Sequence, residues 1–278
     1  MRTTWGSATD RGLVRAVNED SLLAYPPVFL VADGMGGHEA GAEASQLVVE
    51  EFAQLAGQST ATPDEVHACF QRTADRLSRE LAGTHAGTTV AGVAVTAFGT
   101  RSYWLVFNIG DSRVYRWSAG VLEQITVDHS VVQELVERGE LSPELAHDHP
   151  DRHVITRVLG TTSAPEPDYW LIPAGERDRL LICSDGLTSE LDDEVILRGL
   201  SEQGSPQETS AWLVGQAVAA GGRDNISVVV IDVAVDGQEI DHGVSVRREN
   251  LLRQLAETWG MGNEDTGSRD RDERETAR

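Results

Sequence analysis

One pattern recurs along this chain and restricts how it can fold: a short apolar run that ends at an aspartate beside a glycine. The first example is Phe29–His38, FLVADGMGGH, in which the apolar run meets Asp33 and glycines follow. A carboxylate at the end of a buried strand is costly unless a cation meets it, and glycines let a ligand approach the backbone closely. Taken alone, the stretch also fits a strand that ends in a glycine-rich turn. The pattern recurs, however, at Asp111 and Asp185, and Asp224 precedes a further apolar run.

Size and cysteine content limit the class of protein. The 278 residues allow one large domain or two small ones. No apolar run reaches the roughly 20 residues needed to cross a bilayer, and the N-terminus lacks the apolar segment of a signal peptide. The two cysteines, Cys69 and Cys183, do not make a disulfide framework. We therefore expect a cytoplasmic protein without a membrane span.

The net charge of the chain limits the kinds of partner that it can bind. The net charge is -22, from 45 acidic and 23 basic residues. A general nucleic-acid binder carries the opposite sign, so we expect no nucleic-acid partner. An acidic excess suits a protein that gathers divalent cations, although solvated acidic surface is the commoner cause.

Hydrophobic periodicity predicts a chain that mixes strands and helices. Two capping boxes, Thr62–Glu65 and Ser205–Glu208, mark helix starts. Short connections between residues 87 and 125 predict an antiparallel meander there. The expected strands are 3–9, 22–25, 28–32, 87–98, 102–109, 114–117, 121–125, 169–172, 179–183 and 226–235. The expected helices are 41–55, one that starts at 62, 130–138, 191–200 and 205–220.

Two segments depart from the sheet pattern. Within residues 128–160, the stretch HDHPDRH at 147–153 is dense in His and Asp. A metal site is one interpretation, but proline breaks the loop and helical ligand spacing is missing, so we favour an excursion packed beside the functional site. In the C-terminal segment, 246–259 could form one amphipathic helix. Residues 260–278 have almost no large apolar side chain, which predicts disorder.

The strand-end aspartates and the pair Glu19-Asp20 form one acidic constellation. Carboxylates gathered closely repel one another unless cations lie between them. Oxygen ligands with little His and no Cys select Mg²⁺ or Mn²⁺ over Zn²⁺, and two such ions can clamp a phosphoryl displacement. Arg15 would then supply a guanidinium fork for a phosphate dianion, although residues 11–21 alone also fit a charged surface loop.

Six short motifs occur in order and together carry a family resemblance. They are RxxNED at Arg15–Asp20, ADGMGGH at Ala32–His38, GTT at Gly87–Thr89, GDSR at Gly110–Arg113, SDGL at Ser184–Leu187 and GGRDN at Gly221–Asn225. Each motif alone is weak, but six in order are highly specific. Over roughly residues 3–235 the chain resembles the PPM, or type 2C, metal-dependent protein serine/threonine phosphatases, and their bacterial branch in particular.

The resemblance implies an α+β fold, a four-layer αββα sandwich of two antiparallel β-sheets flanked by helices. It implies a phosphatase domain at 1–240, with a flap at about 128–160, and a C-terminal tail at 241–278. The implied activity is hydrolysis of phosphoserine and phosphothreonine in proteins by a metal-activated bridging hydroxide, without a covalent intermediate. The implied partners are phosphorylated proteins, among them Ser/Thr kinases and their substrates, and we expect a monomer.

The resemblance also implies metal ligands by position. The cofactors would be two Mn²⁺ or Mg²⁺ ions, with a weaker third ion in bacterial members. Asp33 matches the residue that bridges the first and second ions, and the carbonyl of Gly34 matches a ligand of the first. Asp185 and Asp224 match ligands of the second ion, and Asp111 with Asp185 matches the third site.

Further positions match residues that act around the metals. Glu19 and Asp20 match the acidic pair that holds metal-bound waters, and Arg15 matches the phosphate-binding arginine. One position departs from the pattern, because Met35 stands where eukaryotic relatives carry a His proposed as the general acid. His38 is the nearest replacement. A metal-bound water could equally supply the proton, and His38 could be a structural residue at a helix entry.

Two alternative functions stay open at this stage. One is a catalytically silent regulator that binds phosphoproteins, and the intact aspartates argue against it. The other is a switch phosphatase dedicated to one anti-sigma-type partner, and the lack of a fused sensor or coiled-coil domain argues against that.

Overall fold

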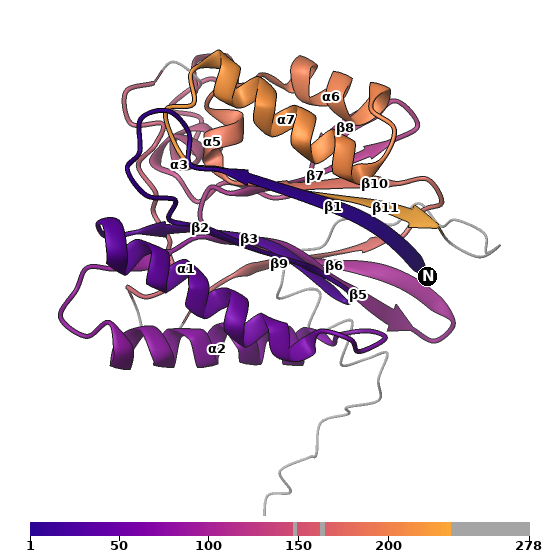
Figure 1. Cartoon of the computed structure of the whole chain (residues 1–278), viewed down its shortest axis with the longest axis horizontal. Helices are drawn as coiled ribbons and strands as arrows, with labels where there is room; N and C mark the ends of the chain where they lie inside the picture. The colour runs from indigo at the N-terminus through magenta and orange to yellow at the C-terminus, as the bar shows by residue number, and fades with distance from the viewer. Residues whose placement is uncertain (147–148, 162–164, 235–278) are drawn as a thin grey trace, which may run out of the picture.

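Two antiparallel β-sheets stack face to face in the computed structural model, with helices on both outer faces (Figure 1). The structure describes residues 1–146, 149–161 and 165–234, apart from the side chain of His38. One sheet has five strands in the order β1 (Arg2–Asp10), β11 (Ile226–Ala234), β10 (Arg179–Cys183), β7 (Arg113–Ser118) and β8 (Val121–Gln124). The six-stranded sheet has the order β2 (Asp20–Tyr25), β3 (Val28–Met35), β5 (Val90–Phe98), β6 (Arg101–Ile109) and β9 (Asp168–Pro173), and β4 (Gly87–Thr88) pairs with β3. The expected four-layer sandwich is confirmed.

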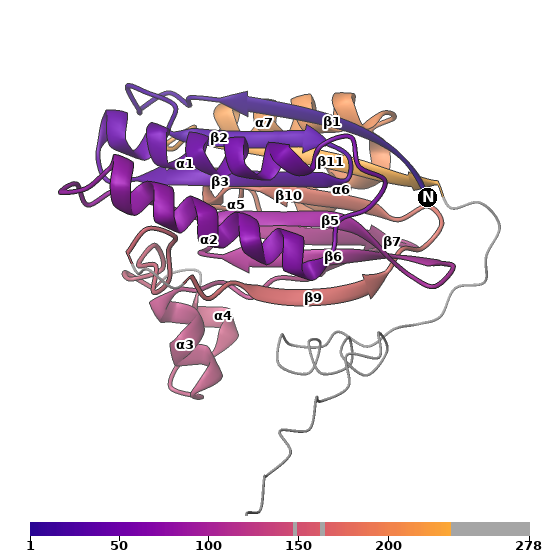
Figure 2. The same ribbon diagram turned by 90° about the horizontal axis from the view of Figure 1, so that it is seen from below.

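Each sheet has its own helical layer. The helices α1 (His38–Phe52) and α2 (Pro63–Glu80), joined through the 3-10 turn η1 (Ala53–Leu55), cover the six-stranded sheet. The helices α5 (Asp185–Thr188), α6 (Asp193–Glu202) and α7 (Pro206–Ala220) cover the five-stranded sheet. Two short helices, α3 (Val131–Glu137) and α4 (Pro143–Ala146), project from one side of the sandwich (Figure 2). They belong to the predicted flap.

Three apolar clusters separate the four layers. In β3, Leu30 faces the helices while Phe29 and Val31 face the opposite sheet. Successive strand residues point to opposite faces, and both faces of β3 are covered, so the run from 28 to 32 is apolar throughout. The strand is therefore fixed at the centre of the molecule, and this position places Asp33 near its C-terminal end.

The helix-start signals agree with the structure. Thr62 and Ser205 both form complete capping boxes, each with a proline at the start of the helix that follows. Asp192 caps α6 through the backbone N–H of Val195. Capping satisfies N–H groups that have no partner inside the helix, which is why these boundaries are readable from sequence.

Some boundaries differ from the expectation. The strand β3 continues through Asp33 to Met35, because the short strand β4 pairs with its last residues. The helix α1 begins at His38, three residues before the expected 41, directly after Gly37, whose φ is 94°. The glycine-rich turn is thus shorter than the sequence suggested.

The expected meander is wrong. The strands β5 and β6 pair in the six-stranded sheet, whereas β7 and β8 pair in the other sheet. The chain changes sheets between Ile109 and Arg113. Gly110 has a φ of 110°, and a Cβ there would lie 2.6 Å from Thr89, so only glycine allows this crossing. A short connection joins stacked sheets here, and not neighbouring strands.

Several expectations fall on residues outside the description. They are the helix at 246–259, the disordered end and the boundary near 240, together with His147 in the HDHPDRH stretch. Within the residues that the structure describes, no helix has the length and apolar character needed to span a membrane.

Candidate metal centre

An open cleft lies at one end of the sandwich, where loops from both sheets meet. Its volume is about 580 Å³. Most of the site residues expected from sequence line it, and these are Arg15, Glu19, Asp33, Gly34, Asp111, Asp185 and Asp224. Asp20 is not among the lining residues, and the side chain of His38 lies outside the described part of the chain.

The six-stranded sheet places Asp33 opposite Asp20. The two residues are direct partners in the antiparallel β2–β3 ladder. Thr88 and Thr89 fix the backbone of Asp33: the Thr88 Oγ1 donates to its carbonyl at 2.9 Å, and its own N–H donates to the Thr89 Oγ1 at 3.1 Å. This explains the GTT motif. A Cβ on Gly34 would lie 2.0 Å from the Gly41 carbonyl oxygen, so the helix α1 packs too closely there for any side chain.

The five-stranded sheet supplies the opposing carboxylates. Asp185 is the first residue of α5, two residues after the end of β10, and Asp224 lies two residues before the start of β11. Ser184 links the two sheets, because its hydroxyl donates to the Asp20 Oδ2 at 2.8 Å. Asn225 fastens the N-terminal loop: its Oδ1 accepts from the Glu19 N–H at 2.8 Å, and its Nδ2 donates to two loop carbonyls.

The carboxylates raise one another's pKa values. Burial and the nearby Asp20 and Asp185 raise the pKa of Asp33 well above its usual range. Burial raises the pKa of Asp20 to about 7. The pKa of Asp111 is raised by burial and by Asp185, and that of Asp185 by burial and by Asp224. Each carboxylate therefore destabilises the charge on its neighbours.

Unpartnered oxygens show that the cluster fits a cation. One buried carboxylate oxygen on each of Asp20, Asp111 and Asp185 has no hydrogen-bond partner. As they stand, no three His, Cys, Asp or Glu side chains of the described residues are arranged so that they could hold a metal ion, so metal binding would draw these carboxylates closer together. Acidic groups without a cation between them repel one another. The donor set is all oxygen, which fits Mn²⁺ or Mg²⁺.

Arg15 reaches the cleft from the N-terminal loop. Its Nη2 lies 2.6 Å from the Asp224 Oδ2, and the side chain is 52% exposed. The hydrogen bond to Asp224 raises the pKa of the guanidinium. The arginine is thus held at the cleft mouth by one carboxylate and keeps donors free for an anion.

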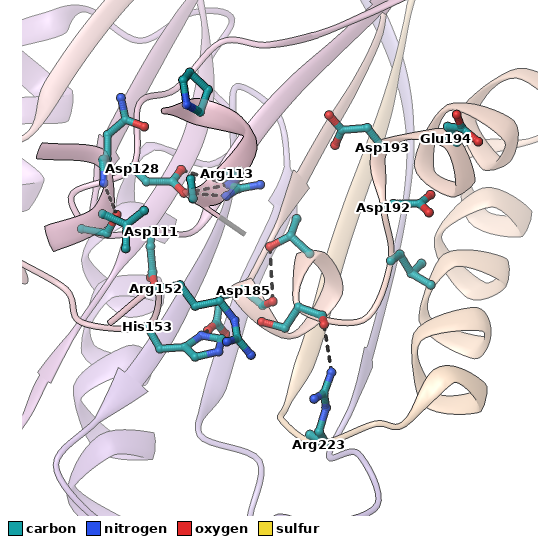
Figure 3. A pocket seen from close by; sticks show the side chains of 18 residues that line it. Asp111, Arg113, Asp128, Arg152, His153, Asp185, Asp192, Asp193, Glu194 and Arg223 are labelled. Carbon is teal, nitrogen blue, oxygen red and sulfur yellow. Dashed lines mark hydrogen bonds and ion pairs between the residues drawn. The ribbon is translucent and has the colours of Figure 1, made fainter. Parts of the chain in front are cut away.

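The flap contributes residues that sequence reasoning did not assign to the site. Arg152 and His153 line the cleft and also a second cavity of about 790 Å³ beside it. Figure 3 shows both side chains next to Asp185, and the His153 Nδ1 lies 3.9 Å from the Asp185 Oδ2. These two residues lie in the HDHPDRH stretch at 147–153. Its high content of His and Asp was the only feature of the sequence that pointed to a role at the site. Ser184, Asn225 and the GTT threonines were inside recognised motifs but received no role.

A sequence profile of the family described as Protein phosphatase 2C matches residues 15–216. The chain belongs to the protein phosphatase 2C family. It is 41% identical over 235 residues to the Mycobacterium tuberculosis serine/threonine protein phosphatase PstP, with 82% of this chain and 45% of the relative covered. The chain thus spans less than half the length of that phosphatase.

Other family members are covered almost completely. The Listeria monocytogenes serine/threonine phosphatase stp is 34% identical over 239 residues, with 81% of this chain and 93% of the relative covered. The crystal structure of the PstP catalytic domain in complex with two manganese ions is 36% identical, with a TM-score of 0.71 over 83% of this chain and 97% of that one. A relative of this chain thus holds two Mn²⁺ ions, and the protein phosphatase 2C family is metal-dependent.

Proposed function

We propose that this chain hydrolyses phosphoserine and phosphothreonine in proteins with Mn²⁺ or Mg²⁺ held by the cleft carboxylates. One observation carries the proposal: acidic groups from both sheets converge, raise one another's pKa values and leave buried oxygens without partners. An uncompensated group of this kind is costly. A bound cation balances it, and a phosphate monoester is the anion that such a centre and an adjacent guanidinium would accept.

The carboxylates have distinct roles in this proposal. Asp33 would bridge two ions, with the Gly34 carbonyl on one and Asp185 and Asp224 on the other. Asp111 with Asp185 would hold a third, weaker ion. When bound, the ions supply Lewis acidity and lower the pKa of water.

Two further acidic groups act around the ions. Glu19 and Asp20 would orient metal-bound waters. Asp20 is suited to this because its Oδ2 accepts a hydrogen bond from Ser184 while its Oδ1 has no partner.

Arg15 would bind and orient the phosphate. Its guanidinium is preset by Asp224 at 2.6 Å, so little side-chain freedom remains to be lost when the substrate binds. Hydrolysis breaks the bond between phosphorus and the serine or threonine oxygen, and the departing alkoxide needs a proton. Met35 lines the cleft but has no proton to give. We assign His38 as the residue of this chain that donates the proton.

The partners follow from the same reaction. Protein phosphoserine and phosphothreonine are made by Ser/Thr kinases, so the kinases and their targets are the proposed substrates, in the cytoplasm. The enzyme would act as a monomer and would not bind nucleic acid.

The test is metal-dependent phosphate release. Purified full chain is assayed with phosphoserine, phosphothreonine and phosphotyrosine peptides and with an aryl phosphate, in Mn²⁺, in Mg²⁺ and in EDTA. We expect turnover of the phosphoserine and phosphothreonine peptides in Mn²⁺, and loss of turnover in EDTA that added Mn²⁺ restores. Undiminished turnover in EDTA, or binding of phosphopeptides without any turnover in Mn²⁺, would contradict the proposal.

A further inference from the structure

Two consecutive residues at the root of the flap hold the turn that carries Asp111. His129 is 3% exposed. Its Nδ1 accepts a hydrogen bond from the Gly110 N–H at 3.1 Å, and its own N–H donates to the Gly110 carbonyl at 2.9 Å. The residue before it, Asp128, binds the guanidinium of Arg113 with contacts of 2.6 to 3.0 Å. Asp111 thus lies between two residues that are both held by the flap root.

The imidazole of His129 is fully committed. Because Nδ1 accepts from Gly110, the proton sits on Nε2, which donates to the Asp168 Oδ2 at 3.1 Å. The carbonyl of His129 accepts from the Thr156 N–H at 2.8 Å. One side chain therefore joins the Asp111 turn to β9, and the backbone of the same residue joins that turn to the returning segment of the flap at Thr156.

The two helices of the flap bury few side chains. Val132 is the single buried residue of α3, and α4 has none. The flap root is closed by a bridge between Ser130 and Ile155 and by the Val131 N–H to Val154 carbonyl bond at 2.9 Å. Beyond Arg152 and His153, the chain is held again at the bridge between Leu159 and Thr88. The placement of Arg152 and His153 therefore depends on the flap root and on this second attachment.

We propose that Asp128 and His129 are positioning residues that fasten the flap to the Asp111 turn. In this arrangement the same contacts help to set where Asp111 points and where Arg152 and His153 lie beside Asp185 (Figure 3). The flap and the Asp111 carboxylate then move as one unit. A protein substrate, which must fit beneath the flap, depends on this unit more than a small aryl phosphate does. The inference rests on the proposed function.

Variants can separate the two links of His129. Asparagine places an oxygen near the position of Nδ1 and can keep the Gly110 bond, whereas glutamine reaches the position of Nε2 and can keep only the Asp168 bond. We expect His129→Gln to be the more damaging change and His129→Asn to be partly rescued.

Arg113→Lys removes the bidentate contact with Asp128. Its matched control is Arg116→Lys on the same strand, which changes a similar pair with Asp178 at 2.9 Å far from the cleft.

The first measurement is trypsin cleavage in the flap of the metal-free full chain, after Arg138 or Arg152. One lost hydrogen bond raises the open population by about tenfold, so His129→Gln and Arg113→Lys should be cut about tenfold faster than wild type. Arg116→Lys should match wild type. Asp111→Asn, which removes the carboxylate but keeps the turn, should also leave the rate unchanged.

The second measurement is kinetic. In Mn²⁺, His129→Gln and Arg113→Lys should lose about tenfold in kcat/KM for a phosphothreonine peptide, with a smaller loss on an aryl phosphate. Flap cleavage no faster than in Arg116→Lys would overturn the proposal, as would equal kinetic losses on both substrates. A wild type without phosphatase activity would sink the proposed function alone, because the cleavage experiment still tests the flap attachment.

Discussion

Buried acidic groups are treated differently at two places in the molecule. In the helical layer over the six-stranded sheet, Glu51 is 5% exposed and is held by Arg72 at 2.8 Å and Arg76 at 3.1 Å. Burial raises its pKa, but the two arginines outweigh burial and the pKa is lowered. In the cleft, the pKa of Asp33 is raised well above its usual range by burial and by other carboxylates.

The difference shows which acidic groups are structural. Asp178 and Asp232 are also paired with arginines, at 2.9 Å to Arg116 and 2.6 Å to Arg179. Arginines of the chain thus neutralise the buried carboxylates that have a structural role. Among the described residues, the cleft acids have one close arginine pair, Arg15 with Asp224 at 2.6 Å, and a longer contact from His153 to Asp185 at 3.9 Å. Asp20, Asp33 and Asp111 have no such pair there, and a bound cation would balance their charge.

Asp33→Asn should break this contrast most strongly. The change keeps size and backbone bonds but removes the central negative charge, so we expect Mn²⁺-dependent activity to fall by at least about 1000-fold, the scale known for groups that act only in catalysis. The metal-free variant should unfold at a higher temperature than metal-free wild type, because repulsion is relieved. Calorimetry of Mn²⁺ binding and thermal unfolding check both effects. Lower stability together with normal metal binding would contradict the assignment.

Arg15→Ala tests the one cleft acid that has an arginine partner. Loss of the guanidinium should raise KM and lower kcat for a phosphothreonine peptide, by roughly 10- to 100-fold in kcat/KM for a lost charge-assisted contact. Mn²⁺ affinity should hardly change, since Arg15 binds phosphate and not metal. Kinetics equal to those of wild type would show that the Arg15–Asp224 pair is only structural.

Glu51→Gln examines the paired side of the comparison. Leaving Arg72 and Arg76 without their buried partner should cost about 1–3 kcal/mol of unfolding free energy, below the full cost of a broken buried pair because both arginines are partly exposed. Phosphatase activity in Mn²⁺ should stay normal at temperatures where the protein is folded. Denaturant unfolding gives the first value and a peptide assay the second.

The pH dependence of stability should separate the two groups. The pKa of Asp20 is about 7 in the folded protein against about 3.9 when unfolded. The contribution of Asp20 to the free energy of unfolding is therefore fully present below about pH 4 and is lost as the pH rises through 7. The metal-free chain should lose stability between pH 5 and 7.5, and the gain on adding Mn²⁺ should grow over the same range because protons compete with the ion. Glu51, with its lowered pKa, contributes no change there. A metal-free stability that rises over this range would contradict the raised pKa values.

The smallest effect is expected from the C-terminal tail. Truncation after Val235 or near Gly260 should leave aryl phosphate turnover within about twofold, since the last recognised motif ends at Asn225. The assay compares the truncated and full chains at equal concentration. Loss of turnover in a soluble truncated chain would show that the tail completes the site.

Much of the fold and of the site was readable because local chemistry fixes it. Capping at Thr62 and the apolar run of β3 depend on neighbours in sequence, and the motif aspartates stand at strand ends. The sheet change at Gly110 was missed because a three-residue connection reads the same for neighbouring strands and for stacked sheets. The register that sets Asp20 against Asp33 follows from the two-residue turn between Tyr25 and Val28. The approach of His153 to Asp185 depends on long-range packing, which leaves no trace in the local sequence.

The two sheets contribute opposite sides of the cleft: Asp33 comes from the six-stranded sheet, whereas Asp185 and Asp224 adjoin strands of the five-stranded sheet. Ions bound between them would therefore act as cross-links between the two halves of the sandwich, at the end where carboxylates replace the apolar filling. Removing the metal would leave that end held by polar contacts, among them the Ser184–Asp20, Asn225–Glu19 and Arg15–Asp224 pairs, while the apolar filling between the sheets remained closed. In hydrogen exchange the metal-free protein should open from the cleft inward, with the amides at the Asp33 end of β3 exchanging before those near Val28.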